Sequence, residues 1–106
     1  MITQPQPPRG TREIWHLRLY VAGTTANSTR ALANLRQICA EHLPEAQIEV
    51  IDLVADPARA VADDVFAVPT LIRRLPTPVQ RIIGDLSDTE RVLVGLNVSL
   101  TEESYR

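Results

Sequence analysis

The chain of 106 residues is 44% hydrophobic, which suits one compact domain with a modest core. A net charge of −2 and a pI near 5.6 argue against nucleic acid as the main partner. A single cysteine excludes an internal disulfide and a Cys-X-X-Cys pair, and no apolar run reaches the roughly 18 residues of a membrane-spanning helix. No signal-peptide pattern is present, so we expect a cytoplasmic protein with no membrane partner.

The flanking segments differ in composition from the middle of the chain. Residues 1–12 are rich in proline and polar side chains and are expected to form a flexible arm, and residues 101–106 a short C-terminal tail. We therefore expect one folded domain over residues 13–100.

The first half of this domain has the pattern of a β-α-β unit. Residues 14–21 alternate apolar and polar side chains, which is typical of a strand. An amphipathic helix of about 15 residues follows, capped by Asn27 or Ser28, and ends before Pro44. Residues 48–54 predict a second strand with apolar side chains on both faces, as expected where both faces are covered. A right-handed crossover would pair the two strands in parallel.

The second half is expected to begin with a short helix and to continue into a hairpin. Asp56-Pro57 is a favourable helix start, because a capping residue precedes a proline in the first turn. Residues 70–75 and 80–83 predict the two strands of the hairpin, joined across a proline-rich turn.

Residues 87–100 fit two structures. Ser87 and Glu90 have the spacing of a capping box at the start of a last helix. The alternation of apolar residues from Val92 to Leu100 fits a strand as well, and Gly95 costs a helix about 1 kcal/mol relative to alanine. The pattern alone leaves both structures open.

These elements together predict an α/β fold in the order β-α-β-α-β-β-α. Val68-Pro69-Thr70, at the entry to the hairpin, resembles the segment by which thioredoxin-like domains enter their second pair of strands. We therefore expect a thioredoxin-like fold, with the Val68–Pro69 peptide bond in cis.

The residues that carry redox chemistry in such a fold are missing. The active loop would span residues 23–27, and its threonines supply no thiolate. Cys39 lies on the apolar face of the first helix and is expected to be buried. His16 and His42 are not spaced for a metal site. We expect no metal, cofactor or catalytic site; a thioredoxin-fold enzyme of glutathione or weak thiol chemistry is the alternative.

Arg73, Arg74 and Arg81 form the one basic cluster, beside the proline-rich turn. A hairpin would allow two of them to share a face with Arg81. Two interpretations stay open: a solvated edge that discourages strand-to-strand aggregation, or an anchor for acidic residues of a partner. The second predicts that alanine at Arg73 and Arg74 weakens partner binding without unfolding the domain.

Several motifs closely resemble the KaiB family over about residues 16–97. The most specific block runs from Pro69 to Ser87. The residues that carry the resemblance are Leu19-Tyr20-Val21-Ala22-Gly23, Asn27-Ser28, Arg30-Ala31, Val50-Ile51-Asp52, Pro57, Pro69-Thr70-Leu71, Pro76, Pro78 and Arg81-Ile82-Ile83-Gly84-Asp85-Leu86-Ser87.

This resemblance implies a non-catalytic regulatory protein that binds a KaiC-type double-ring ATPase, in circadian timing or in a stress response. It also implies two folds that differ in the C-terminal half, a thioredoxin-like monomer and a ground-state tetramer, so a homo-oligomer (dimer or tetramer) is a further expected partner. The positions that the resemblance implies for the fold switch are Pro69, Pro76, Pro78, Gly84, Asp85 and Gly95.

The resemblance adds Asp64 and Asn97 to the arginine cluster as expected partner-binding residues. Cyanobacterial members carry a basic residue near the first position and an aspartate at the second, and both positions help to form or tune the KaiC-binding state. This chain also departs from those members at Ala26, Val68 and Thr77, where they have proline, threonine and proline.

Overall fold

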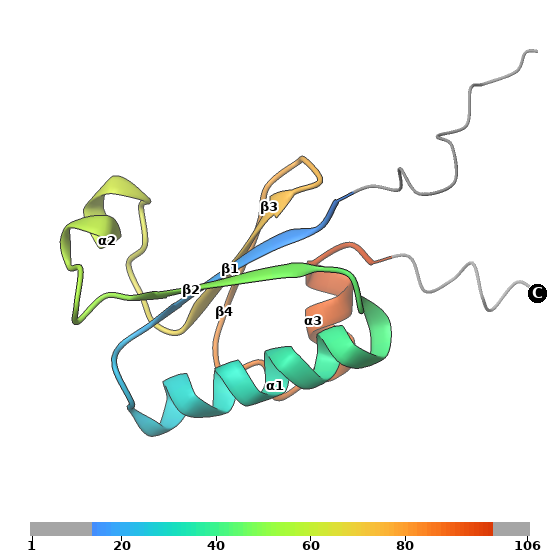
Figure 1. Cartoon of the computed structure of the whole chain (residues 1–106), viewed down its shortest axis with the longest axis horizontal. Coiled ribbons are helices and arrows are strands. Elements are labelled where there is room, and N and C mark those ends of the chain that lie inside the picture. Colours follow the sequence, from blue (N-terminus) through green and yellow to red (C-terminus); the bar gives the residue numbers. More distant parts are fainter. Residues whose placement is uncertain (1–13, 99–106) are drawn as a thin grey trace, which may run out of the picture.

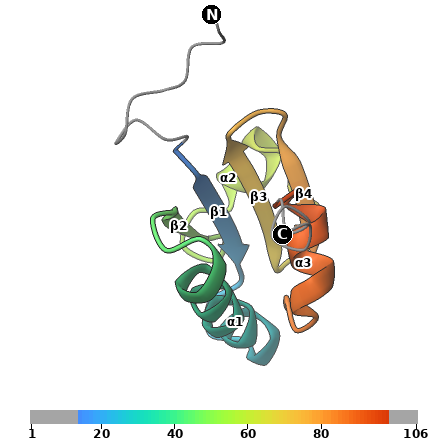
Figure 2. The same ribbon diagram turned by 90° about the vertical axis from the view of Figure 1, so that its right-hand side faces the viewer.

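Four strands form a mixed sheet that carries two helices on one face and a short helix near one end of the other (Figures 1 and 2). The computed structural model describes residues 14–98, so the expected arm at 1–12 and tail at 101–106 lie outside the described part. Within it, the predicted order β-α-β-α-β-β-α is confirmed. The elements are β1 (His16–Val21), α1 (Ala26–His42), β2 (Gln47–Asp52), α2 (Ala58–Ala62), β3 (Thr70–Leu75), β4 (Gln80–Ile83) and α3 (Thr89–Gly95).

The strands lie in the order β2-β1-β3-β4. β1 pairs in parallel with β2, as the β-α-β pattern predicts, with Leu19 opposite Val50. β3 runs antiparallel to β1, with Leu71 opposite Leu19, and forms the expected hairpin with β4. Both edges of β1 and of β3 are therefore paired with neighbouring strands, whereas β2 and β4 are edge strands.

The main core lies between the sheet and the two helices α1 and α3. Leu17 and Leu19 of β1 and Leu71 of β3 are fully buried there, in one cluster with Leu35 of α1 and with Leu96, the C-cap of α3. Alanine at a site of this kind typically costs about 2–5 kcal/mol of stability. This core fixes the position of α3 against the hairpin.

A smaller apolar cluster lies on the opposite face of the sheet. Tyr20, Ile51, Val65 and Ile72 form it. The second strand contributes to both clusters, since Ile48 packs against the main core and Ile51 lies in the smaller one. β2 is nevertheless an edge strand, and most of its residues are at least partly exposed. An apolar pattern cannot report strand order, so the edge position was not visible in the sequence.

The helix caps differ from the predicted ones. Thr25, not Asn27 or Ser28, caps α1, because its hydroxyl accepts a hydrogen bond from the Ser28 backbone amide. Ser28 is instead buried, and its hydroxyl accepts a hydrogen bond from the Ala22 amide. Asp88 rather than Ser87 caps α3, with its carboxylate accepting from the backbone amide of the residue three positions on.

Within the stretch that fits two patterns, residues 89–95 are helical in this arrangement. Val92, Leu93 and Leu96 are buried at helical spacing, whereas Val94 points outward. Gly95 faces β4, where a Cβ atom would lie 2.8 Å from Ile82 Cδ1. The glycine that weakens the helix in isolation thus permits its close approach to the sheet.

The peptide bond between Val68 and Pro69 is cis, as expected from the thioredoxin-like motif. The bonds preceding Pro76 and Pro78 in the β3–β4 turn are cis as well. Among residues 14–98, no helix is long and apolar enough to cross a membrane.

Candidate partner-binding site

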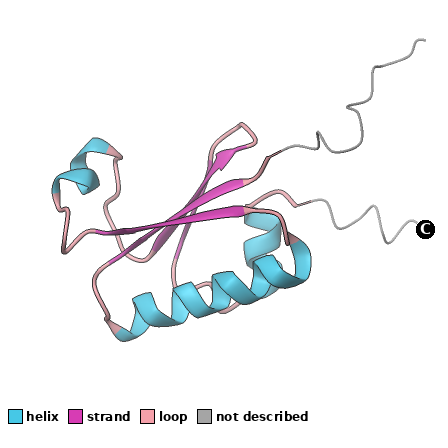
Figure 3. Ribbon diagram, in the orientation of Figure 1, coloured by secondary structure: helices cyan, strands magenta, loops and turns pink. Residues whose placement is uncertain are grey.

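The segment between β2 and β3, residues 53–69, exposes an unusual amount of apolar surface. It consists of loops around the short helix α2 (Figure 3). Phe66 is 89% exposed and Val61 84%, the highest values among the large apolar side chains of the described residues. Val54 and Val68 are exposed on the same segment. A contiguous stretch with this many uncovered apolar side chains is a candidate surface for a protein partner.

The end of α2 determines which of these side chains point outward. Asp64 has a φ of 60°, and its amide donates to the Val61 carbonyl at 3.3 Å, while the Val65 amide donates to the Ala60 carbonyl at 2.8 Å. These two bonds form a Schellman motif, in which a left-handed residue ends the helix. The turn sends Val65 into the core and leaves Phe66 outside.

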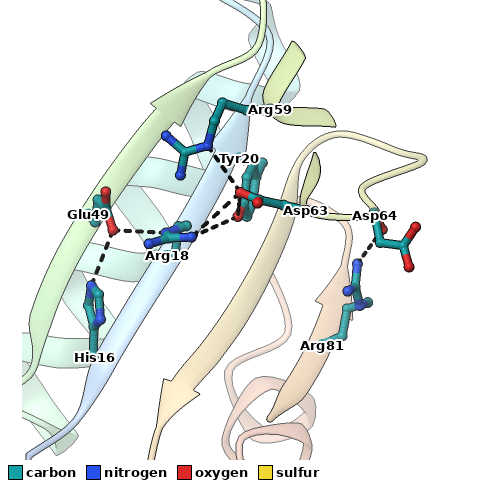
Figure 4. Close-up of polar contacts among 8 residues, drawn as sticks. All are labelled: His16, Arg18, Tyr20, Glu49, Arg59, Asp63, Asp64 and Arg81. Atoms are coloured by element: carbon teal, nitrogen blue, oxygen red, sulfur yellow. Dashed lines mark hydrogen bonds and ion pairs between the residues drawn. The ribbon is translucent and has the colours of Figure 1, made fainter. Parts of the chain in front are cut away.

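A polar network on the sheet holds the same end of α2 (Figure 4). The Tyr20 hydroxyl donates to the Asp63 carboxylate at 2.6 Å, and Arg59 Nε donates to the same carboxylate at 3.2 Å. Arg18 Nη1 lies 3.5 Å from it. The hydrogen bond from Tyr20 and the neighbouring arginines lower the pKa of Asp63, while burial together with the bond to Asp63 raises the pKa of Tyr20.

The network continues across β1 to β2. Arg18 Nε donates to Glu49 Oε1 at 2.8 Å, and His16 Nε2 lies 3.3 Å from the same oxygen. The hydrogen bond from Arg18 lowers the pKa of Glu49. The sequence does place His16, Arg18 and Tyr20 on one face of a strand, but it does not reveal their carboxylate partners, which come from β2 and from the end of α2.

Arg81 and Asp64 are brought together by the fold, through the backbone of Asp64. Arg81 Nη1 donates to the Asp64 carbonyl at 2.8 Å, so it fixes the loop after α2 to β4 (Figure 4). Arg74 shares this face of the hairpin, since Ile72 pairs with Arg81 and side chains alternate along β3. Arg74 is exposed and forms no hydrogen bond or ion pair with other described residues.

Arg73 does not belong to a surface cluster, and that expectation is wrong. It faces the core side of the sheet and is 2% exposed. Its Nη1 donates to the Leu96 carbonyl at 2.5 Å and its Nη2 to the Pro78 carbonyl at 2.7 Å, and the guanidinium lies 5.1 Å from the centre of the Trp15 ring. Adjacent residues of a strand point to opposite faces, so Arg73 and Arg74 cannot share one.

Asn97 has the same structural role at α3 as Asp64 has at α2. Its φ is 62°, its amide donates to the Val94 carbonyl at 2.9 Å, and the Val98 amide donates to the Leu93 carbonyl at 2.9 Å. The two partner-binding positions that the resemblance adds, Asp64 and Asn97, are thus left-handed residues of Schellman motifs. No residue pattern indicated this.

Two of the expected fold-switch positions lie in the loop between β4 and α3. Gly84 has a φ of 128° and donates its amide to the Pro69 carbonyl at 3.0 Å. The Asp85 carboxylate accepts a hydrogen bond from the Ser87 amide at 3.1 Å and forms an ion pair with Arg30 at 3.4 Å. These contacts with Ser87 and Arg30 lower the pKa of Asp85. These contacts connect the loop to β3 and to α1.

Thiol chemistry has no suitable group in the described part of the chain. Cys39 is buried in the main core, and burial raises the pKa of its thiol to about 11. A thiol with so high a pKa is almost entirely protonated at neutral pH and is a poor nucleophile. Residues 14–98 also contain no group of three or more metal-ligating side chains.

The fold and this site together define a thioredoxin-like domain with an exposed apolar segment. The N-terminal domain of Synechococcus elongatus SasA superposes with a TM-score of 0.67 at 20% identity, over 92% of this chain and 97% of that one. Mitochondrial thioredoxin 3 from Saccharomyces cerevisiae gives a TM-score of 0.63 at 17% identity, over 78% and 76%. At these identities the likeness establishes the fold alone.

The chain belongs to the KaiB family, because the KaiB domain matches residues 18–98. It is 51% identical over 94 residues to a circadian clock oscillator protein KaiB from Synechococcus sp., covering 88% of this chain and 86% of the relative. It is 47% identical over 83 residues to the circadian clock protein KaiB3 from Synechocystis sp., covering 77% and 81%. The resemblance seen in the sequence is confirmed, and it supports a clock regulatory role.

Proposed function

We propose that this chain is a non-catalytic regulatory protein that binds a KaiC-type ATPase in the cytoplasm, and that the thioredoxin-like arrangement is its binding form. The observation that carries the proposal is its family membership over residues 18–98. Its relatives are named as circadian clock proteins, so circadian timing is the first role to test and a stress response the second.

The surface proposed for the ATPase is the segment 53–69, extended by Arg74 and Arg81 on the hairpin. Phe66 and Val61 supply apolar area, and the exposed Arg74 can pair with an acidic residue of the partner. Asp64 and Asn97 contribute indirectly, since they set the paths of the chain after α2 and α3.

The binding test compares Phe66→Ala with Val94→Ala, using a KaiC-type ATPase from the same organism. Phe66 lies on the proposed surface, whereas Val94 is an exposed apolar residue on α3 and serves as the matched control. We expect the first variant to bind at least about tenfold more weakly, as a central interface aromatic does, and the second to bind like the wild type. Equal affinity of both variants would rule out the segment as the interface. A wild-type protein that does not bind would rule out the proposed function.

A second arrangement of the C-terminal half is part of the proposal. The sequence of residues 87–100 fits a strand pattern as well as a helix, and residues 89–95 form the helix α3 in this structure. The implied alternative is a dimer or tetramer. NMR spectra of the wild type at low micromolar and near-millimolar concentration test this. Two slowly exchanging sets of peaks for residues 65–98 support two folds, and a single set at both concentrations contradicts their coexistence at rest.

An enzyme of glutathione or weak thiol chemistry is the competing function. The buried Cys39, whose pKa is raised to about 11, argues against it. Measurable disulfide reduction or glutathione conjugation that disappears in Cys39→Ala would favour the enzyme and contradict the non-catalytic proposal.

A further inference from the structure

Arg73 is a buried cation without an anionic partner among the described residues. It is 2% exposed and takes part in no ion pair within residues 14–98. Its Nε has no hydrogen-bond partner there either. Burying a guanidinium is costly unless hydrogen bonds replace its hydration. The contacts that Arg73 does make therefore decide whether this arrangement is stable.

Those contacts join three segments that are otherwise separate. Leu96 is the C-cap of α3, Pro78 lies in the turn between β3 and β4, and Trp15 precedes β1. The two carbonyls accept charge-assisted hydrogen bonds, and the indole ring faces the cation. One side chain of β3 thus connects the end of α3, the tip of the hairpin and the start of the sheet.

The carbonyl at Leu96 is one that the helix cannot satisfy by itself. The Schellman motif uses the carbonyls of Leu93 and Val94, and leaves that of Leu96 free at the negative end of the helix. A helix of 7 residues is too short to persist without tertiary contacts. Its docking therefore depends on its apolar face and on Arg73.

We propose that Arg73 is a latch for α3: its guanidinium holds the helix end and the β3–β4 turn against the sheet, and its loss lets α3 open while the β1–α1–β2 unit stays folded. The inference concerns the isolated domain and goes beyond the choice of partner.

The test is amide hydrogen exchange on Arg73→Met and Arg73→Lys, with the exposed neighbour Arg74→Met as the matched control. The amides of Leu96, Asn97 and Val98 report on α3, and the amide of Leu53, which donates to the Val21 carbonyl, reports on the β1–β2 pair. We expect exchange at α3 to rise roughly tenfold to a hundredfold in Arg73→Met, because two bonds to a charged group are lost and two carbonyls are orphaned. Lysine keeps the charge but lacks the planar fork of two terminal nitrogens, so it should give a smaller rise, and exchange at Leu53 should change little.

Fluorescence of Trp15, the single tryptophan of the chain, provides a second readout of the same contact. Its emission should change in both Arg73 variants and stay the same in Arg74→Met. A parallel rise in exchange at α3 and at Leu53 would overturn the latch, since Arg73 would then be an ordinary core residue. Unchanged exchange at α3 would overturn it as well. If Arg73→Met does not fold, the same comparison of exchange at α3 and at Leu53 is made with Arg73→Lys.

Discussion

The hydroxyl of Tyr20 donates a 2.6 Å hydrogen bond to the carboxylate of Asp63 and so joins the central strand to the end of α2 (Figure 4). Tyr20 is 1% exposed and belongs to the smaller apolar cluster of the sheet, whereas α2 has no buried residue. The helix next to Phe66 is therefore held by polar contacts at its C-terminal end, together with the buried Val65 that follows it. This arrangement makes the candidate surface sensitive to changes that leave the core intact.

Tyr20→Phe removes this hydrogen bond and keeps the ring. We expect it to lower the free energy of unfolding by about 1–2 kcal/mol, since a bond to a charged acceptor is lost and the carboxylate keeps its arginine contacts. Chemical denaturation measures the loss, and faster exchange of the Val65 amide locates it at α2. Tyr105→Phe removes the chain's other tyrosine hydroxyl and is the control. Equal stability of Tyr20→Phe and the wild type would contradict the prediction.

The same network predicts how stability depends on pH. The hydrogen bond from Tyr20 lowers the pKa of Asp63, and the one from Arg18 lowers the pKa of Glu49. A carboxyl with a lower pKa in the folded state stabilises the fold above its unfolded pKa, and that contribution is lost as pH falls through the folded value. We therefore expect the free energy of unfolding to decline below about pH 4.

Asp63→Asn should reduce stability at pH 7 and make the acid decline shallower. Urea denaturation between neutral pH and about pH 2.5 measures both effects. Asp56→Asn is the matched control, because the exposed Asp56 side chain makes no hydrogen bond or ion pair within the described residues. An unchanged slope in Asp63→Asn would show that the carboxylate does not contribute as the network implies.

The order of the helices and strands was predictable because each element has a recognisable local pattern in the sequence. The alternation in β1, the periodicity of α1 and the proline-rich turn between 75 and 80 each predict one element, and the motif at Val68-Pro69 identified the fold. The sequence alone left helix and strand open for residues 92–95. They are helical in this arrangement because burial against Ile82 and the sheet compensates for a weak helix preference.

The candidate site was less predictable, for two different reasons. The opposite directions of Arg73 and Arg74 follow from strand alternation once the hairpin is assumed, so a signal existed. The hydrogen bond between Tyr20 and Asp63 left no signal in the sequence, because the two residues lie 43 positions apart and are brought together only by the position of α2. The left-handed conformations of Asp64 and Asn97 likewise depend on where each helix ends.

Replacing Asn97 by glycine should leave the stability of the fold nearly unchanged, whereas replacing it by alanine should lower it. Its φ of 62° lies in the left-handed region, which glycine adopts freely and asparagine adopts more readily than alanine. We expect Asn97→Ala to lower the free energy of unfolding by about 1 kcal/mol and Asn97→Gly to match the wild type within about 0.5 kcal/mol. Thermal unfolding compares the pair, and exchange of the Val98 amide reports the C-cap. If alanine and glycine changed the free energy of unfolding equally, the left-handed backbone conformation of Asn97 would not explain the effect.

Gly95 and Ile82 should be energetically coupled, because the glycine leaves room for the isoleucine. A Cβ at position 95 would lie 2.8 Å from Ile82 Cδ1 and 3.0 Å from its Cγ1, too close without a shift of that side chain. We expect Gly95→Ala alone to cost about 1 kcal/mol, since the overpacking exceeds the gain in helix propensity.

Ile82→Val removes the Cδ1 methyl and should resolve this conflict. Alone, it is expected to cost about 1 kcal/mol, as a buried methyl group typically does. In the Gly95→Ala background the cost should disappear, which gives a coupling energy of about 1 kcal/mol in a double-mutant cycle measured by chemical denaturation. Val94→Ala, in place of Gly95→Ala, is the control cycle, because Val94 points away from the sheet and should show additive effects. Additivity in the Gly95 cycle as well would mean that α3 can move off β4 freely, and that the glycine is not required for its packing.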